Sequence, residues 1–191
     1  MKFVSYNDWS QLPESARALF EQAEGESLFF CRQWFECVAA TALQADDNIV
    51  LACVLSGDKV MAILPLMESA SNNIWYSLSH GFTPHYSLLL ANGEQERILT
   101  CLARALSQLP LKGLLLQPVA NDDSKLRVLQ KCMTAAGFNC DYAFRHYNWV
   151  YRAQGQSYAQ YMAARPAQLR NTISRKKRKL EREHGYEIRL F

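Results

Sequence analysis

The strongest constraint on the fold of this chain is a β-hairpin, which both of its strands and its turn predict. Residues 49–55 form a continuous apolar run of β-favouring side chains, and residues 60–66 form a second one. Between them, residues 56–59 (SGDK) supply the chemistry of a tight turn. Pro65 cannot donate to a strand ladder, so it predicts a sheet edge or a bulge late in the second strand.

A short strand and two helices are predicted before the hairpin. The strand covers residues 3–6. Pro13 opens the first helix and Gly25 ends it, and its apolar face consists of Ala16, Leu19, Phe20 and Ala23. The second helix covers residues 30–43, where helical spacing relates Phe30, Trp34, Cys37, Val38 and Thr41.

Strands and helices alternate after the hairpin. Strands are predicted at residues 74–78, 86–90 and 112–117, and the last of these has the pattern of a buried strand. A helix from Glu94 carries inward Ile98, Leu102, Ala105, Leu106 and Leu109. A further helix has N-caps in Asp122-Asp123-Ser124, an end at Gly137, and an apolar face of Leu126, Leu129, Met133 and Ala136. Residues 138–150 are predicted to be extended, as two strands interrupted near His146.

This order of elements predicts a mixed α/β (α+β) domain, with a largely antiparallel sheet covered by helices on both faces. The chain has 191 residues, of which 49% are hydrophobic, so it can bury a real core and is not disordered as a whole. Its longest apolar run has seven residues, against the ~20 that a membrane span needs. The N-terminus has no apolar signal region, and we expect a cytoplasmic protein.

The cysteines and histidines predict neither disulfides nor a metal site. None of the six cysteines has C-x-x-C spacing, and the four histidines have no metal-binding spacing. We expect reduced thiols that pack as small apolar residues. The four tryptophans, Trp9, Trp34, Trp75 and Trp149, are interpreted as core residues.

Positive charge is concentrated at the C-terminal end. Residues 165–191 carry nine Lys and Arg against three Glu, a net charge of +6, whereas residues 1–164 carry twelve against fifteen, a net charge of −3. A Ser157/Gln160 capping box opens a short helix. Pro166 begins a longer one that runs to about Glu183, with a thin apolar stripe of Leu169, Ile173 and Leu180. Residues 186–191 are predicted to begin a strand.

The order of elements resembles that of the GNAT acyltransferase superfamily. In both, two helices lie between the first and second strands, and a β-meander and an αβαβ series follow. The chain resembles in particular the N-terminal half of the CelD-like, cellulose-biosynthesis-type acetyltransferases, which are similar to the Fem peptidoglycan aminoacyltransferases. The segments that carry the resemblance are SLFFCRQWFECVAA (27–40), DKVMAILPLMES (58–69), HYSLLL (85–90) and LRNTISRKKRKLEREHGYEIRLF (169–191). It implies that residues 1–156 are a first GNAT-like domain. Residues 157–191 are then a basic helical arm and the first strand of a second acyltransferase domain that is absent.

By this resemblance, the whole enzyme moves an acyl group from acetyl-CoA, another acyl-CoA or a similar thioester or ester donor. The acceptor is an amine or hydroxyl of a small molecule, a sugar or a cell-envelope precursor. A working GNAT half holds the CoA pyrophosphate on a Gln/Arg-x-x-Gly-x-Gly/Ala loop before a helix. The corresponding residues 90–96 (LANGEQE) contain one glycine and the carboxylates of Glu94 and Glu96. We therefore expect this chain alone to bind no acyl-CoA tightly and to be inactive, because the catalytic half is missing.

His80, His85 and Tyr86 are the substrate-binding candidates. They lie in a loop that contains Gly and Pro and follows a strand, which is a usual place for ligand contacts. Acyl transfer to an amine needs a base, and imidazole titrates near neutral pH. The alternative is a surface loop with two ordinary histidines. No residue is assigned as catalytic.

Arg170, Arg175 and Lys177 are the anion-binding candidates of the basic helix. The run 175–179 wraps around the helix without interleaved aromatic residues, which disfavours nucleic-acid binding. The helix is interpreted as a solvated inter-domain linker, with an anionic ligand (CoA, a substrate phosphate or tRNA) or a membrane surface as alternatives. The rival function is a non-enzymatic binding module whose basic helix contacts RNA or another polyanion. We expect the arm to be mobile or to be held by another molecule, for instance in a homodimer.

Overall fold

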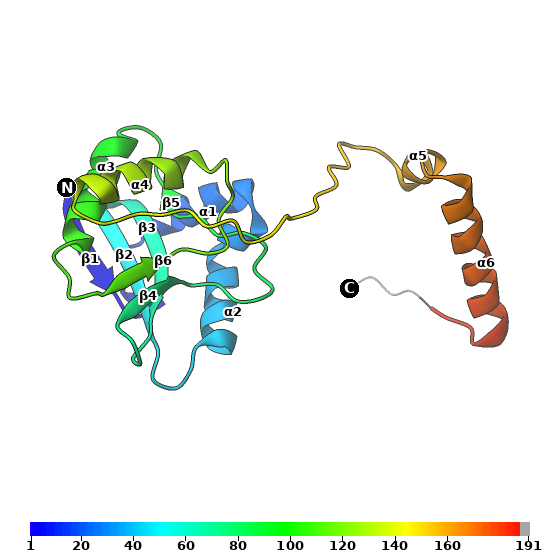
Figure 1. The fold of residues 1–191 in the computed structure, drawn as a ribbon, viewed down its shortest axis with the longest axis horizontal. Coiled ribbons are helices and arrows are strands. Elements are labelled where there is room, and N and C mark those ends of the chain that lie inside the picture. The colour runs from blue at the N-terminus through cyan, green and yellow to red at the C-terminus, as the bar shows by residue number, and fades with distance from the viewer. Residues whose placement is uncertain (188–191) are drawn as a thin grey trace. The chain divides into compact units, whose positions relative to one another are not determined.

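The computed structural model of the chain describes residues 1–187 and divides into two compact units, Met1–His146 and Tyr147–Phe191 (Figure 1). The first unit holds the sheet and its covering helices, and the second holds two helices. The first unit ends ten residues before the boundary that the sequence suggests at residue 156. The interpretation of the two parts as pieces of two acyltransferase domains stays a prediction.

A mixed sheet is the centre of the first unit. Its strands are β1 (Lys2–Tyr6), β2 (Asn48–Ser56), β3 (Lys59–Glu68), β4 (Ile74–Ser77), β5 (Leu89–Leu90) and β6 (Gly113–Leu115). The strand order is β1-β2-β3-β4-β6, and β5 pairs with β3 beside β4. Every strand pair is antiparallel except β4 with β6, which is parallel. The predicted fold class, mixed and largely antiparallel, is confirmed.

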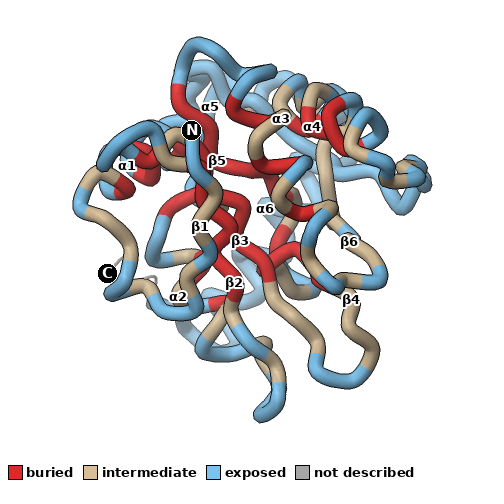
Figure 2. The backbone as a smooth tube through the Cα atoms, turned by 90° about the vertical axis from the view of Figure 1, so that its left-hand side faces the viewer, coloured by how far each residue is buried: buried red, intermediate tan, exposed pale blue. Residues whose placement is uncertain are grey.

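Helices cover both faces of the sheet. They are α1 (Ala16–Glu26), α2 (Arg32–Ala42), α3 (Gln95–Leu106) and α4 (Ser124–Ala135), with the short 3-10 turns η1 (Trp9–Gln11) and η2 (Leu28–Phe30). Successive strand residues point to opposite faces. All residues from 50 to 54 of β2 and from 62 to 66 of β3 are nevertheless buried, so both faces are covered (Figure 2). Helix α3 packs on β1 and β2, and α1 packs on β3 and β5.

The predicted hairpin is confirmed in strands and turn. Its tip is formed by Gly57 and Asp58, and Gly57 has the positive φ (59°) that such turns need. Ser15 ties the start of α1 to this tip, because its hydroxyl donates to the Asp58 carbonyl (2.8 Å) and accepts from the Val60 N–H (3.1 Å). The hairpin therefore positions the first helix as well as the sheet.

The strand next to β3 is interrupted opposite Pro65. Strand β4 pairs with residues 66–68 of β3 and β5 pairs with residues 62 and 63, while residues 78–88 leave the sheet between them. The Pro65 carbonyl accepts from the Leu78 N–H (3.0 Å) and from the Tyr86 hydroxyl (2.6 Å). The N–H and C=O of a strand residue point to the same side, so the missing N–H of Pro65 faces this excursion. The predicted edge position is wrong: β3 is interior, and the irregularity lies in its neighbour.

Three other predicted strands differ from the structure. Of residues 86–90 only Leu89–Leu90 pair in the sheet, because Tyr86 turns away to form a parallel bridge with Val119. The strand at 112–117 is shortened to β6 and is only half-buried, since β6 lies at the end of the sheet. Residues 138–150 form no strand, and Trp149, predicted to be a core residue, is 95% exposed. Trp75, by contrast, is buried as expected.

The predicted apolar face is confirmed for α1 and only in part for the helix predicted at residues 30–43, where Phe30 and Val38 are buried as predicted. Helix α1 buries the four predicted residues, Ala16, Leu19, Phe20 and Ala23. Helix α2 buries Phe35 and Val38, whereas Cys37 and Thr41 are exposed. The reason is that the Phe35 ring meets the edges of Phe20 and Tyr86. This rotates the helix away from the predicted face.

The other helices agree well with the sequence, and three cysteines, Cys31, Cys53 and Cys132, are buried as expected, whereas Cys37 is exposed. Asp123 caps α4 by accepting from the Leu126 N–H (3.0 Å), and α3 buries Ile98, Leu102 and Leu106. None of the six cysteines forms a disulfide. Burial raises the pKa of the Cys53 thiol to about 12, as expected for a thiol that packs as an apolar residue.

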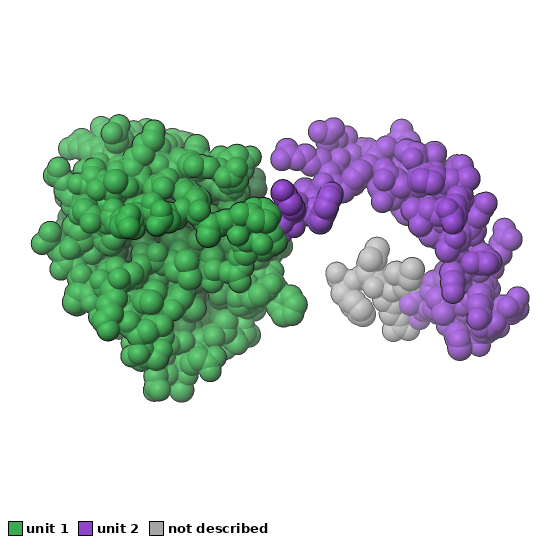
Figure 3. Space-filling model, in the orientation of Figure 1, with its two compact units in different colours: residues 1–146 green, residues 147–191 purple. Residues whose placement is uncertain are grey.

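The second unit contains α5 (Tyr158–Ala163) and α6 (Ala167–Glu183) (Figure 3). Both halves of the predicted Ser157/Gln160 capping box are formed. No residue of α6 is buried, including its apolar stripe of Leu169, Ile173 and Leu180. Tyr186 and Glu187 form no strand, and the rest of the strand predicted at 186–191 lies outside the described residues.

The orientation of α2 can be tested with two substitutions on this helix. Phe35→Ala removes a fully buried ring and is expected to lower the free energy of unfolding by about 3–5 kcal/mol. Cys37→Ala changes an exposed side chain two residues away and should stay within about 0.5 kcal/mol of the unchanged chain. Urea unfolding followed by circular dichroism measures both. Equal losses for the two variants would contradict this orientation.

Candidate functional site

The candidate site lies at the carboxyl ends of the parallel strand pair. Strand β4 ends at Ser77 and is followed by the loop of residues 78–88, and β6 ends at Leu115 and is followed by residues 116–123. Loops at the carboxyl ends of parallel strands are where open α/β sheets bind ligands. The predicted site residues His80, His85 and Tyr86 all lie in the first of these loops.

Hydrogen bonds hold the two loops together. The hydroxyls of Ser77 and Ser79 donate to the Gln117 carbonyl (2.6 and 2.7 Å), and the Gln117 N–H donates back to the Ser77 hydroxyl (3.0 Å). The Tyr86 N–H donates to the Pro118 carbonyl (2.6 Å). The loops therefore form one connected support rather than two separate flaps.

Tyr86 belongs to this support. Its side chain is fully buried, and burial raises the pKa of the phenol well above its ordinary value. Its hydroxyl donates a hydrogen bond to the Pro65 carbonyl. The structure thus places Tyr86 beneath the loop, where it orients the neighbouring His85.

The loop brings both histidines onto aromatic side chains of η2 and α2. The centroid of the His85 ring lies 4.8 Å from that of Phe30 and 6.1 Å from that of Phe29. The centroid of the His80 ring lies 5.8 Å from that of Trp34, and all three contacts are edge-to-face. Phe29 and Trp34 meet each other at 4.8 Å. We call these five residues the imidazole–aromatic cluster. The sequence reasoning missed its aromatic half, although the run SLFFCRQW contains all three rings.

His80 has a defined hydrogen-bond pattern. Its Nδ1 accepts from the Phe82 N–H (3.0 Å), and its backbone carbonyl accepts from the Thr83 N–H (2.9 Å). An imidazole nitrogen that accepts carries no proton, so a neutral His80 ring carries its proton on Nε2. Phe82, at the tip of this turn, is 86% exposed and lies 5.6 Å from the His80 ring.

Charged side chains of α1 and α4 surround His85. Lys125 forms an ion pair with Glu26 (2.6 Å) and lies over the Phe30 ring at 5.6 Å. Burial against the phenyl rings lowers the pKa of His85; the Asp123 carboxylate opposes this shift, and the Lys125 ammonium adds to it. His85 is therefore a neutral imidazole at neutral pH, with a ring nitrogen able to accept a proton.

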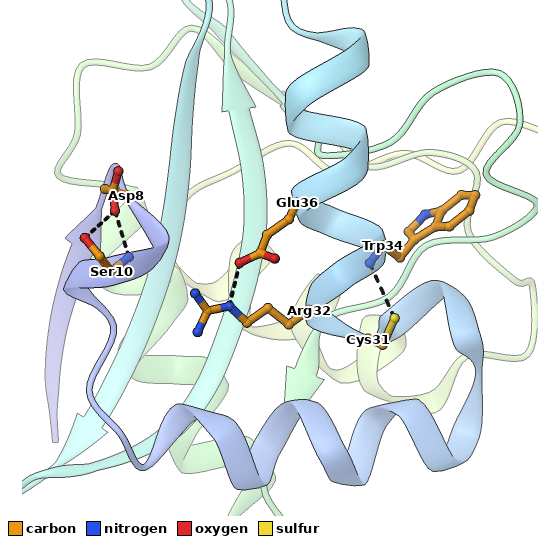
Figure 4. Close-up of polar contacts among 6 residues, drawn as sticks. All are labelled: Asp8, Ser10, Cys31, Arg32, Trp34 and Glu36. Carbon is orange, nitrogen blue, oxygen red and sulfur yellow. Dashed lines mark hydrogen bonds and ion pairs between the residues drawn. The ribbon is translucent and has the colours of Figure 1, made fainter.

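A polar patch lies on the side of α2 opposite to Trp34 (Figure 4). The Trp34 indole points away from Glu36, which binds Arg32 (2.7 Å) on the side near Asp8 and Ser10 (Figure 4). The backbone N–H of Trp34 donates to the sulfur of Cys31 (3.4 Å), and Cys31 is the N-cap residue of α2. The indole Nε1 of Trp34 is buried and has no hydrogen-bond partner among the described residues. Such a donor inside a site can serve a ligand.

The N-terminus of α3 does not fit a pyrophosphate. Glu94 precedes the helix in a left-handed conformation, and Glu96 lies in its first turn. Arg97 is held by Glu94 in a 2.9 Å ion pair. Two carboxylates therefore lie at this helix N-terminus, where their negative charge disfavours the binding of a phosphate.

The three anion-binding candidates lie on α6 and are exposed. At about 100° per residue, Arg170 and Lys177 share one side of the helix, and Arg175 lies about 140° around it from Arg170. Lys177 pairs weakly with Glu181 (3.9 Å). The helix presents positive charge on several sides, and the three residues do not converge on one point.

Comparisons with known proteins add a partial likeness of fold. A probable acetyltransferase matches with a TM-score of 0.47 and 14% identity, over 80% of this chain and 99% of that one. The aminoglycoside acetyltransferase meta-AAC0020, from an uncultured soil metagenomic sample, matches in its sisomicin and trehalose complexes. Their TM-scores are 0.44 and 0.42, each with 15% identity over 79% of this chain and 96% of that one. No protein-family model and no curated protein matches the chain.

At TM-scores below 0.5, these likenesses assign neither a family nor an activity. Among residues 1–187, no helix combines the length and the apolar character that a bilayer crossing requires.

The environment of His85 makes the stability of the chain depend on pH. Between the lowered pKa of His85 and its ordinary value of 6.5, the unfolded chain binds more protons than the folded one. The free energy of unfolding should therefore fall as the pH drops below 6.5 and level off below the lowered pKa. His85→Phe should flatten this part of the curve, because it keeps a ring against Phe30 without a titrating group.

Denaturant unfolding at pH values from about 5 to about 8 measures this dependence. The matched control is His146→Phe, which removes an exposed imidazole. A slope that His85→Phe leaves unchanged would mean that His85 titrates alike in the folded and unfolded chain.

Proposed function

We propose that this chain provides the acceptor-binding part of an acyltransferase, which transfers an acyl group to an amine or hydroxyl of a sugar or cell-envelope precursor. The single observation that supports it is the position of a neutral, partly buried imidazole, His85, in the loop at the carboxyl end of the parallel strand pair β4–β6. The element order that the resemblance to the GNAT superfamily implies, with α1 and α2 between β1 and β2, agrees with this proposal.

His85 is suited to the role of base. An amine that attacks an acyl carbonyl must lose a proton, and a neutral imidazole can accept it. Burial against Phe29 and Phe30 favours the neutral ring, and Lys125, paired with Glu26, lies over the Phe30 ring. The Nδ1 of His80 already accepts a hydrogen bond from the Phe82 N–H. In the neutral ring, the Nε2–H can therefore donate to a hydroxyl of the bound acyl acceptor.

The aromatic members of the cluster suit a sugar. Exposed aromatic rings bind the apolar faces of small ligands, and a few polar groups then fix their orientation. Phe82 provides an exposed ring and Trp34 a half-buried one, with ring centroids 5.6 Å and 5.8 Å from that of His80. The indole Nε1 of Trp34 offers a further donor to a hydroxyl once a ligand displaces its present neighbours.

Acceptor binding can be tested by NMR titration of the full chain with glucosamine and with glucose. We expect glucosamine to shift the ring signals of His85 and His80, because the amine and the base must come together. Trp34→Leu should weaken these shifts, whereas Trp75→Leu, on β4, serves as a control for the loss of a tryptophan. If neither sugar shifts either histidine, the acceptor proposal is wrong.

The donor is predicted not to bind at the N-terminus of α3. Because Glu94 and Glu96 repel phosphate, calorimetric titration with acetyl-CoA should give no micromolar binding to the chain. The double change Glu94→Gln with Glu96→Gln removes this repulsion and should at most produce weak binding that disappears with added salt. Micromolar binding to the unchanged chain, or turnover by it alone, would contradict this prediction and leave the acceptor test unaffected.

The rival function is a binding module for RNA or another polyanion. Its supporting feature is α6, which is exposed throughout and carries Arg170, Arg175 and Lys177. Sequence-selective RNA binding at physiological salt, reduced by changing these three residues to Gln, would favour the module over the acyltransferase.

A further inference from the structure

The loop between β5 and α3 contains the one Asn-Gly pair of the chain, Asn92-Gly93. Nine asparagines occur in the sequence, and each of the other eight is followed by a residue that carries a side chain. The amide carbon of an asparagine side chain can be attacked by the backbone nitrogen of the next residue, which makes asparagine chemically labile. A glycine has no β-carbon to obstruct this approach. The sequence therefore separates Asn92 from every other asparagine of the chain.

The structure leaves the side-chain amide of Asn92 without a hydrogen bond. Asn92 and Gly93 are both exposed and belong to no strand or helix. In the described part of the chain, neither the Asn92 side chain nor the Gly93 N–H has a hydrogen-bond partner. A hydrogen-bonded amide must release its partner before its Cγ atom can face the next backbone nitrogen. At Asn92 no such release is needed.

Other asparagines of the first unit are held in place. The Oδ1 of Asn121 accepts from the guanidinium of Arg127 (2.8 Å). Asn72 uses both ends of its amide, since its Oδ1 accepts from the Ile74 N–H and its Nδ2 donates to the Tyr76 hydroxyl, both at 2.9 Å. A hydrogen bond to a charged group is strong enough to slow an attack at Asn121 by at least about tenfold. These two residues are therefore comparisons within the same chain.

The turn itself requires the glycine at position 93. Gly93 has a φ of 81°, and Glu94 after it has a φ of 44°. A β-carbon at position 93 would meet no atom within 4 Å, so the constraint is the backbone conformation rather than a lack of space. Glycine adopts a positive φ without strain, whereas a residue with a side chain does not. The start of α3 thus keeps an unobstructed backbone nitrogen next to Asn92.

We propose that Asn92 is a site of spontaneous deamidation in the folded chain. The Gly93 nitrogen attacks the Cγ atom of Asn92 and loses its proton. The new N–Cγ bond forms, the Cγ–Nδ2 bond breaks, and ammonia leaves with that proton, so that a five-membered cyclic imide joins the two residues. Water then adds its hydroxyl to one of the two ring carbonyls and a proton to the ring nitrogen as the bond between them breaks. The products are aspartate and isoaspartate at position 92.

This reaction adds negative charge where α3 begins. Each event replaces a neutral amide with a carboxylate, and the carboxylates of Glu94 and Glu96 already lie at this end of the helix. Isoaspartate also lengthens the main chain between β5 and α3 by one methylene group, because the chain then runs through the former side chain. The modified protein therefore repels an anion at this position more strongly than the unmodified one.

Peptide mapping by mass spectrometry tests this proposal on the full chain, incubated at mildly alkaline pH and well below its unfolding temperature. The peptide that contains Asn92 should gain about 1 Da as the amide becomes a carboxylate. The peptide that contains Asn121 should gain this mass at least about tenfold more slowly. The matched variant Asn92→Gln should stay unmodified at this position, because its longer side chain would have to close a larger ring. Circular dichroism checks that both chains stay folded during the incubation.

The same incubation in urea separates the effect of the fold from that of the sequence. We expect Asn92 to be modified in the folded chain as well as in the unfolded one, because the fold gives its amide no partner. If Asn92 keeps its amide in the folded chain and loses it in urea, the fold shields the pair and the proposal is wrong. Equal rates at Asn92 and Asn121 in the folded chain would overturn it too, because neither the glycine nor the unbonded amide would then decide the site.

Discussion

The carbonyl of Pro65 is the contact on which the rest of the candidate site depends. Pro65 belongs to an interior strand, but the hydrogen bonds to its carbonyl come from the loop of residues 78–88, which leaves the sheet. The donors are the Leu78 N–H at the start of this loop and the Tyr86 hydroxyl near its end. A buried carbonyl without donors costs about 1–3 kcal/mol, so this arrangement holds the loop in one conformation. The Tyr86 ring also meets Phe35, and β3, the loop and α2 thereby converge on one side chain. His80 and His85 lie between these two anchors.

The parts of the fold that the sequence predicted are those encoded by neighbouring residues. The hairpin has two apolar runs around a turn, α1 has its four apolar residues at helical spacing, and α4 has its own cap in Asp123. The differences arise where a distant partner decides. Phe35 faces the core because Phe20 and Tyr86 receive its ring, and β6 is half-exposed because it ends the sheet. No local pattern contains that information.

The same division applies to the site. Loop composition was enough to single out His80 and His85, since glycine and proline around histidines mark a loop that can bind. Their partners Phe29, Phe30 and Trp34 lie about fifty positions earlier, in a segment whose helical spacing suggested core packing. Tyr86 was grouped with the histidines, although its register turns it inward. His85 is half-buried and the adjacent Tyr86 is fully buried, so sequence proximity cannot tell a ligand contact from a support.

Contacts of the site join residues that are far apart in the chain. The Tyr86 N–H reaches Pro118, and Lys125 reaches Glu26 at a separation of 99 positions, whereas the hairpin joins neighbours across a short turn. Long loops lose more entropy on closing, so the hairpin can form well before the histidines meet their rings. In reverse, we expect the backbone amides of the two site loops to exchange with solvent through smaller openings than those of β2 and β3. The histidines of the candidate site thus depend on contacts between distant parts of the chain, where a ligand can shift the local equilibrium without unfolding the sheet.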